Sequence, residues 1–172
     1  MEGTTFTLTS AAFNEEEFIP LKHSLYGENI SPELKWTNVP AETKSLALTM
    51  MDPDTPIGEL SHWLLKDIPP STTGFAEGSF VGTPVPTDCS SFPSIEFEGK
   101  DKFAYAGKKT YSSYTKFAQG PKPPSGTHRY FFTLYALNIE TFEATEKDSF
   151  RKKCEEHKIG QAQLMGKYSG PA

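Results

Sequence analysis

Two histidines and two aspartates in this sequence lie beside proline-rich segments, next to strongly apolar runs. His128 ends the segment GPKPPSGTH, whose two glycines and three prolines leave the backbone few conformations. Asp52 and Asp54 belong to the segment DPDTP, and the next apolar run opens at His62. Imidazole donates hydrogen bonds and gains charge near neutral pH, and a neighbouring carboxylate orients the ring. These residue types indicate a site for a phosphate or carboxylate anion.

The elements that must position these residues are mostly β-strands. The run from His128 to Leu137 is apolar on both of its faces, which is typical of a central strand covered on both sides. The expected strands are Thr5–Thr9, Ser45–Asp52, His62–Ile68, His128–Leu137 and the tail Ile159–Tyr168. One helix is predicted, Thr145–His157, with Thr145 as its N-cap and Phe150, Cys154 and His157 on the face toward the sheet. Strands dominate, so we expect a mainly β, two-layer architecture in one domain, residues 1–172.

The strand order suggests how the polar residues meet. If the strand that ends at Asp52 and the strand that begins at His62 are antiparallel neighbours, the two side chains face each other at one edge of the sheet. His128 also opens a strand, and Trp63 and Tyr130 would supply an apolar floor. A few polar groups converging on apolar walls are characteristic of ligand pockets. Each residue also has a structural interpretation, since Asp-Pro-Asp forms turns and lone histidines often serve as hydrogen-bonding groups.

The bulk composition narrows the class of protein. The chain has 172 residues, a net charge of −5 and a pI near 5.4, which argues against a nucleic-acid partner or an anionic membrane surface. We find no secretory signal and no apolar run long enough to insert into a membrane, and we expect a cytoplasmic protein. Cys89 and Cys154 lack metal-binding spacing and are expected as free thiols, with a disulfide as the alternative. No cofactor is expected.

The segment at about 74–118 is a long connection that contains many lysines and tyrosines. Connections of this length inside a compact domain usually carry function or move. The lysines of this segment, together with Lys122 just beyond it, form either a solvated surface or a positive rim that attracts anions to the pocket. They are Lys100, Lys102, Lys108, Lys109, Lys116 and Lys122.

Several stretches resemble the phosphatidylethanolamine-binding protein family, also described as Raf kinase inhibitor-like proteins, and the loop spacing is most similar to its bacterial branch. The matching stretches are SPELKW, DPDTP, HWLLKDIP, GPKPPSGTHRYFFTLYAL and GKY. The resemblance implies a β-sandwich of two antiparallel sheets with one or two peripheral helices and an anion pocket at one edge. Asp52, His62 and His128 would then be pocket residues, Tyr130 a wall residue, and Gly120 and Pro121 the frame of its mouth. The segment Phe80–Phe117 departs from the compact bacterial pattern.

Two classes of function follow. A binding protein would recognise a small phosphate- or carboxylate-containing group and regulate a kinase or protease. In a variant of this function, the protein would inhibit its partner through the exposed loop. A homodimer is a candidate assembly. An enzyme would use an aspartate–histidine pair as a general base, or two histidines and a carboxylate to hold a metal, as a hydrolase. The sequence contains no GxSxG and no HExxH motif, which favours binding over catalysis.

Overall fold

The structure of the protein, a computed structural model, describes residues 5–24, 28, 30–55, 58–78, 112–113, 126–144 and 147–169. Gly120, Pro121, Cys89 and almost all of the predicted connection at 74–118 lie outside these residues. The described elements, in chain order, are β1 (Thr7–Thr9), the 3-10 helix η1 (Leu21–His23), β2 (Leu34–Thr37), β3 (Ser45–Thr55), β4 (Gly58–Ile68), β5 (Gly74–Phe75), β6 (Ser112–Ser113), β7 (Thr127–Leu137), α1 (Lys147–His157) and β8 (Lys158–Ser169). The predicted mainly β fold is confirmed.

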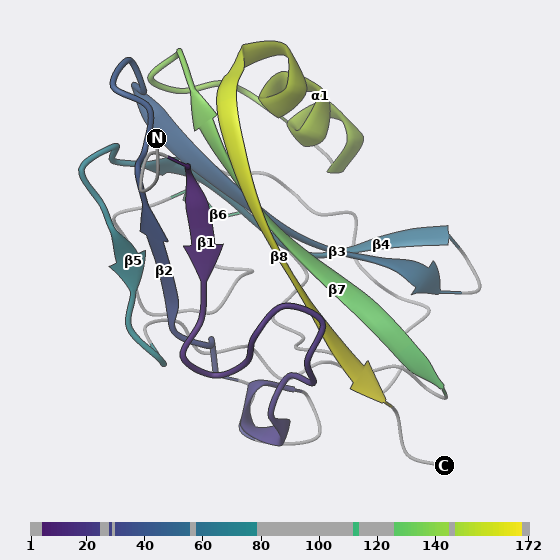
Figure 1. Cartoon of the computed structure of the whole chain (residues 1–172). Helices are drawn as coiled ribbons and strands as arrows, with labels where there is room; N and C mark the ends of the chain where they lie inside the picture. Colours follow the sequence, from purple (N-terminus) through teal and green to yellow (C-terminus); the bar gives the residue numbers. More distant parts are fainter. Residues whose placement is uncertain are drawn as a thin grey trace.

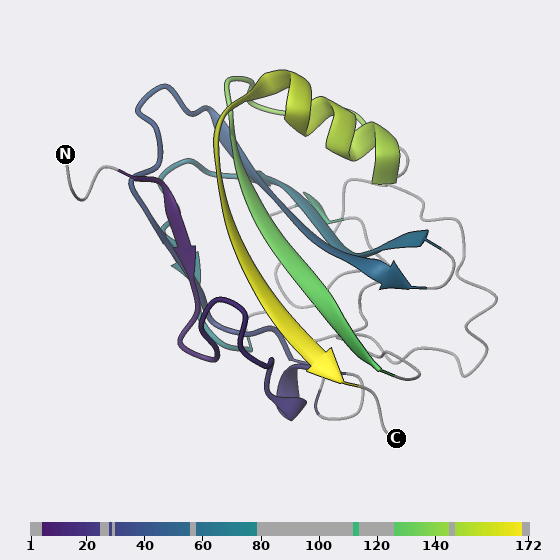
Figure 2. The same ribbon diagram turned by 45° about the vertical axis from the view of Figure 1, so that its right-hand side comes forward.

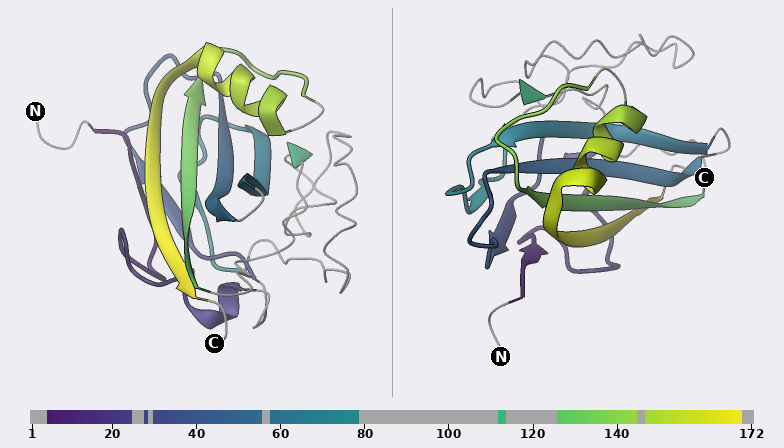
Figure 3. Two further views of the ribbon diagram at one scale, coloured as in Figure 1. Left: turned by 90° about the vertical axis from the view of Figure 1, so that its right-hand side faces the viewer. Right: turned by 90° about the horizontal axis from the view of Figure 1, so that it is seen from above.

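Two antiparallel sheets form the two layers (Figure 1). The smaller sheet has the order β1-β2-β5, and the larger has the order β6-β4-β3-β7-β8. The smaller sheet lies on one side of the larger sheet, and α1 lies on the other (Figure 3). Strands β7 and β8 run side by side along almost their whole length (Figure 2). The sandwich therefore leaves the larger sheet with an inner face toward the smaller sheet and an outer face toward α1.

Apolar residues fill both faces of the larger sheet. Successive side chains of a strand point to opposite faces, so Tyr130 and Phe132 in β7 lie in the inner core, whereas Tyr135 and Leu137 lie in the outer cluster. The inner core also receives Trp36 from β2. Both faces of β7 are covered, as the apolar run predicts.

Strands β3 and β4 both extend further than the sequence predicts. The prediction of a turn at Asp52–Pro56 is wrong for Asp52 to Thr55, because β3 continues to Thr55. His62 does not open a strand either, since β4 begins at Gly58. A proline cannot donate to a sheet ladder, yet Pro53 fits here because the β3–β7 pairs end before Asp52 and the β3–β4 register shifts between Asp52 and Thr55.

The helix α1 packs against the outer face as predicted. It covers Lys147–His157, and the predicted cap Thr145 lies outside the described residues. Phe150 and Cys154 are fully buried beneath it. Cys154 is a free thiol, as expected, and burial raises its pKa, which keeps it uncharged. Within the described ranges, no helix is both long and apolar enough to cross a membrane.

Gly166 in β8 leaves space that two core side chains occupy. A Cβ at this position would lie 2.6 Å from Ile19 Cγ1 and from Phe13 Cε2. We expect Gly166→Ala to lower the free energy of unfolding by about 1–3 kcal/mol, because an added carbon forces packed neighbours to shift. Gly160→Ala in the same strand is the control, since the nearest neighbour of its Cβ would be Pro40 Cγ at 3.1 Å. Urea unfolding measures both variants, and equal losses would contradict this explanation.

Candidate functional site

A buried aspartate–histidine pair connects β3 and β7 on the inner face of the larger sheet. His128 Nδ1 lies 2.7 Å from Asp52 Oδ2, and the two residues are 7% and 2% exposed. Asp52 Oδ1 accepts a hydrogen bond from the backbone N–H of Asp54 at 2.8 Å. Both carboxylate oxygens are therefore engaged: the bond to Oδ1 holds the carboxylate, and Oδ2 orients the imidazole ring. The structure brings together these two residues, which the sequence places at strand ends.

A β-bulge turns His62 toward the same face. Met50 pairs with Trp63 and Met51 pairs with Ser61, so His62 is the extra residue in β4. Without a bulge, His62 and Trp63 would point to opposite faces, and bulges are known to re-aim side chains in this way. The His62 ring contacts the Tyr130 ring edge to face, with centroids 5.2 Å apart.

The four inner-face residues occupy neighbouring positions. Tyr130 follows His128 on the same face of β7, so the His62–Tyr130 contact lies next to the Asp52–His128 pair. His62 and Tyr130 are 4% and 0% exposed. Trp63 is fully buried in the core between the sheets. Its contact with a ligand stays a prediction, as does the convergence of both histidines on one anion.

Asp54 has a different partner from Asp52. Its Oδ2 accepts hydrogen bonds from the backbone N–H of Arg129 at 2.8 Å and from Arg129 Nε at 3.0 Å, and its Oδ1 accepts one from Nη2 at 2.8 Å. Hydrogen bonds from the Arg129 side chain lower the pKa of Asp54. The pair ties the end of β3 to β7 beyond their last ladder bonds. A direct role of Asp54 in ligand binding stays a prediction.

Two further residues border the site, and neither is among the site residues predicted from the sequence. Tyr168 in β8 pairs with His128 in β7 and lies in the inner core. Its hydroxyl hydrogen-bonds with the hydroxyl of Ser24 at 3.0 Å, which connects the site to the end of η1. The signal for Tyr168 was the GKY stretch in a predicted strand, whereas nothing in the local sequence marked Ser24.

The described residues contain no group of three histidines, cysteines, aspartates or glutamates that could hold a metal ion. The described site offers a carboxylate-oriented imidazole next to a second imidazole, with aromatic rings and a phenol around them. Such a set can donate hydrogen bonds to an anion or accept a proton from a polar group.

The comparisons with known proteins agree with this fold. The sequence profile of the phosphatidylethanolamine-binding protein family matches residues 9–169. The chain is 39% identical to a UPF0098 protein of Methanothermobacter thermautotrophicus, over 94% of this chain and 97% of that protein. It is 34% identical to a UPF0098 protein of Aquifex aeolicus, over 96% and 90% of the two chains. The chain therefore belongs to the phosphatidylethanolamine-binding protein family.

Two solved structures are similar to this chain. One is the crystal structure of CT736, a phosphatidylethanolamine-binding protein homolog from Chlamydia trachomatis, with a TM-score of 0.73 and 29% identity over 98% of this chain and 99% of that chain. The other is YbcL from Escherichia coli, with a TM-score of 0.72 and 27% identity over 96% and 99% of the two chains. Both support a bacterial-type member of the family.

Proposed function

We propose that the protein binds a small phosphate- or carboxylate-bearing group through His128 and His62, with Asp52 orienting His128. The observation that carries this proposal is the buried Asp52–His128 pair, with its 2.7 Å contact. A ring held through Nδ1 has Nε2 left for a ligand, and an imidazolium donates a charge-assisted hydrogen bond there. The family name supports a phosphorylated ethanolamine group as the first probe.

In this proposal, ligand binding regulates a partner protein. A protein that presents or withholds such a group could modulate a kinase or protease, and the partner would recognise the loaded or the empty site. The alternative is a hydrolase in which His128 acts as general base, which the same Asp52–His128 pair would support. We favour binding because the sequence carries neither of the two hydrolase motifs considered above.

Calorimetric titration with phosphorylethanolamine tests the proposal. We expect His128→Ala to lower affinity at least about tenfold, since a hydrogen bond to a charged group contributes about 1.5–3 kcal/mol. His157→Ala, which removes a histidine at the end of α1, is the matched control and should bind as the wild type does. Equal affinity in both variants would reject the site. Release of inorganic phosphate by the wild type, lost in Asp52→Asn, would instead establish the hydrolase.

A further inference from the structure

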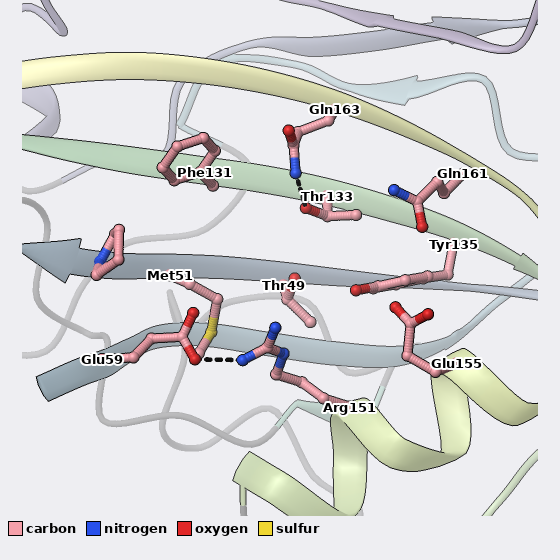
Figure 4. A pocket seen from close by; sticks show the side chains of 11 residues that line it. Thr49, Met51, Glu59, Phe131, Thr133, Tyr135, Arg151, Glu155, Gln161 and Gln163 are labelled. Carbon is pink, nitrogen blue, oxygen red and sulfur yellow. Dashed lines mark hydrogen bonds and ion pairs between the residues drawn. The ribbon is translucent and has the colours of Figure 1, made fainter.

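A cavity lies on the outer face of the larger sheet, opposite the face that carries the Asp52–His128 pair. It has a volume of ≈ 330 Å³ and is bounded by β3, β4, β7, β8 and one side of α1 (Figure 4). Ligand pockets in proteins span about 300–1,000 Å³, so this groove is large enough for a small molecule. None of the site residues described above lines it. It therefore requires an explanation of its own.

The charged residues of the groove are already paired. Arg151 on α1 donates a hydrogen bond to Glu59 on β4, across the floor of the groove (Figure 4). Glu155, one turn further along α1, forms an ion pair with Lys158 at 2.6 Å. A charged ligand would have to compete with one of these pairs or be repelled by its like-charged member. The groove consequently offers little net charge to an ion.

Neutral polar groups make up most of the remaining lining. Gln163 Nε2 donates a hydrogen bond to Thr133 Oγ1 at 3.0 Å (Figure 4). Gln161, beside it on β8, accepts a hydrogen bond from Lys158 Nζ at its Oε1, at 2.8 Å, which leaves its amide N–H groups for a ligand. Burial raises the pKa of Tyr135 to about 12, so the phenol stays a neutral hydrogen-bonding group. These side chains offer both donors and acceptors at several points around one space.

The floor of the groove adds apolar surface. Phe131 on β7 and Met51 on β3 lie next to each other, since they are paired across the two strands. The ring of Tyr135 adds a second aromatic surface at the other end (Figure 4). A neutral ligand that fits this lining needs an apolar surface together with several hydrogen-bonding groups. A sugar ring has both, because its C–H faces are apolar while its edge carries hydroxyls.

We propose that this groove is a second ligand site, which takes a neutral polyhydroxylated ligand such as a monosaccharide unit. Amide and hydroxyl side chains bond the hydroxyls, and Phe131 contacts the C–H face of the ring. The contacts with Glu59 and Lys158 hold Arg151 and Glu155 in place on the α1 side of the groove. This inference is independent of the proposed anion function, because alternation along β3 directs Asp52 to the inner face and Met51 to the groove.

Three methyl glycosides that differ only at C6 of the sugar test the proposal. They are methyl β-glucoside, the corresponding methyl glucuronide, and methyl 6-amino-6-deoxyglucoside, which carry no charge, a negative charge and a positive charge at neutral pH. Each is titrated into the full chain in saturating phosphate, and the side-chain amide signals of Gln161 and Gln163 are followed by NMR. We expect the neutral glucoside to shift these signals at the lowest concentration.

Variants then locate the binding. Gln161→Ala and Gln163→Ala, both at exposed positions, are each expected to weaken glucoside binding about fivefold, as the loss of one hydrogen-bonding amide predicts. His128→Ala on the inner face is expected to leave it unchanged. No shift with any probe up to about 50 mM, or tighter binding of either charged probe, would overturn the proposal. So would unchanged affinity in both glutamine variants.

Discussion

Loss of the proton from the His128 imidazolium is expected to weaken the binding of a fixed-charge sulfonate to the wild-type protein about tenfold or more, and Asp52→Asn is expected to remove most of this pH dependence. The reason lies in which ring nitrogen of His128 carries a proton. A carboxylate can only accept, so the Asp52–His128 contact at 2.7 Å requires a proton on Nδ1. The neutral ring then has a lone pair on Nε2, and only the imidazolium can donate there.

The asparagine variant reverses this arrangement. Its Oδ1 continues to accept the Asp54 N–H, so its amide nitrogen faces His128 Nδ1 and donates to it. The neutral ring must then carry its proton on Nε2, where it can still donate to an anion. Affinity at low pH falls because a charged donor becomes neutral, but it no longer declines as the pH rises.

Ethanesulfonate titrated at several pH values measures this effect, since its charge is fixed whereas phosphate changes its own charge with pH. His128→Ala is expected to bind weakly at every pH, and His157→Ala to follow the wild type. An unchanged pH profile in Asp52→Asn would show that Asp52 does not set the tautomer of His128. Flat affinity in the wild type would mean that backbone amides hold the anion and that the histidines are structural.

Truncating Trp63 is expected to cause the largest loss of stability among the site residues. Trp63 is fully buried between the two sheets, and replacing a buried tryptophan by alanine costs about 3–5 kcal/mol through lost burial and the cavity that remains. Domains are stable by only about 5–15 kcal/mol, so Trp63→Ala should unfold at a much lower urea concentration. Because His62 precedes it in the bulge, the variant should also lose order at His62.

Urea unfolding followed by circular dichroism measures the change. Trp63→Phe, which keeps an aromatic ring in the core, is expected to lose less than half as much stability. Leu21→Ala, at a residue that is 58% exposed, is the control for a surface truncation and should change stability little. A loss below about 1 kcal/mol in Trp63→Ala would contradict the packing seen between the sheets.

Much of the fold could be predicted because alternation is a local property of the sequence. The run from His128 to Leu137 was predicted as a central strand, and β7 occupies Thr127–Leu137 with its two sets of side chains in two separate clusters. The helix and the last strand were also predicted close to their observed bounds. In each case the signal lies within one element.

The boundaries of β3 and β4 could not be predicted in the same way. Asp-Pro-Asp is a turn sequence by composition, and only the absence of a ladder partner for Pro53 allows it to stay in a strand. The meeting of Asp52 with His128 followed from strand order. The pairing of Asp54 with Arg129 had no sequence signal beyond a basic residue next to a histidine.

The residue types of the proposed anion site, the two-layer β class and the faces of the central strand follow from the sequence alone, because each depends on composition or on a period of two. The tertiary structure decided what depends on register between distant segments. The bulge that turns His62 to the same face as Trp63 is a shift of one residue in the pairing of β4 with β3. The outer groove is closed by Glu59 and Arg151, which are 92 residues apart in the chain, and no local pattern encodes that contact.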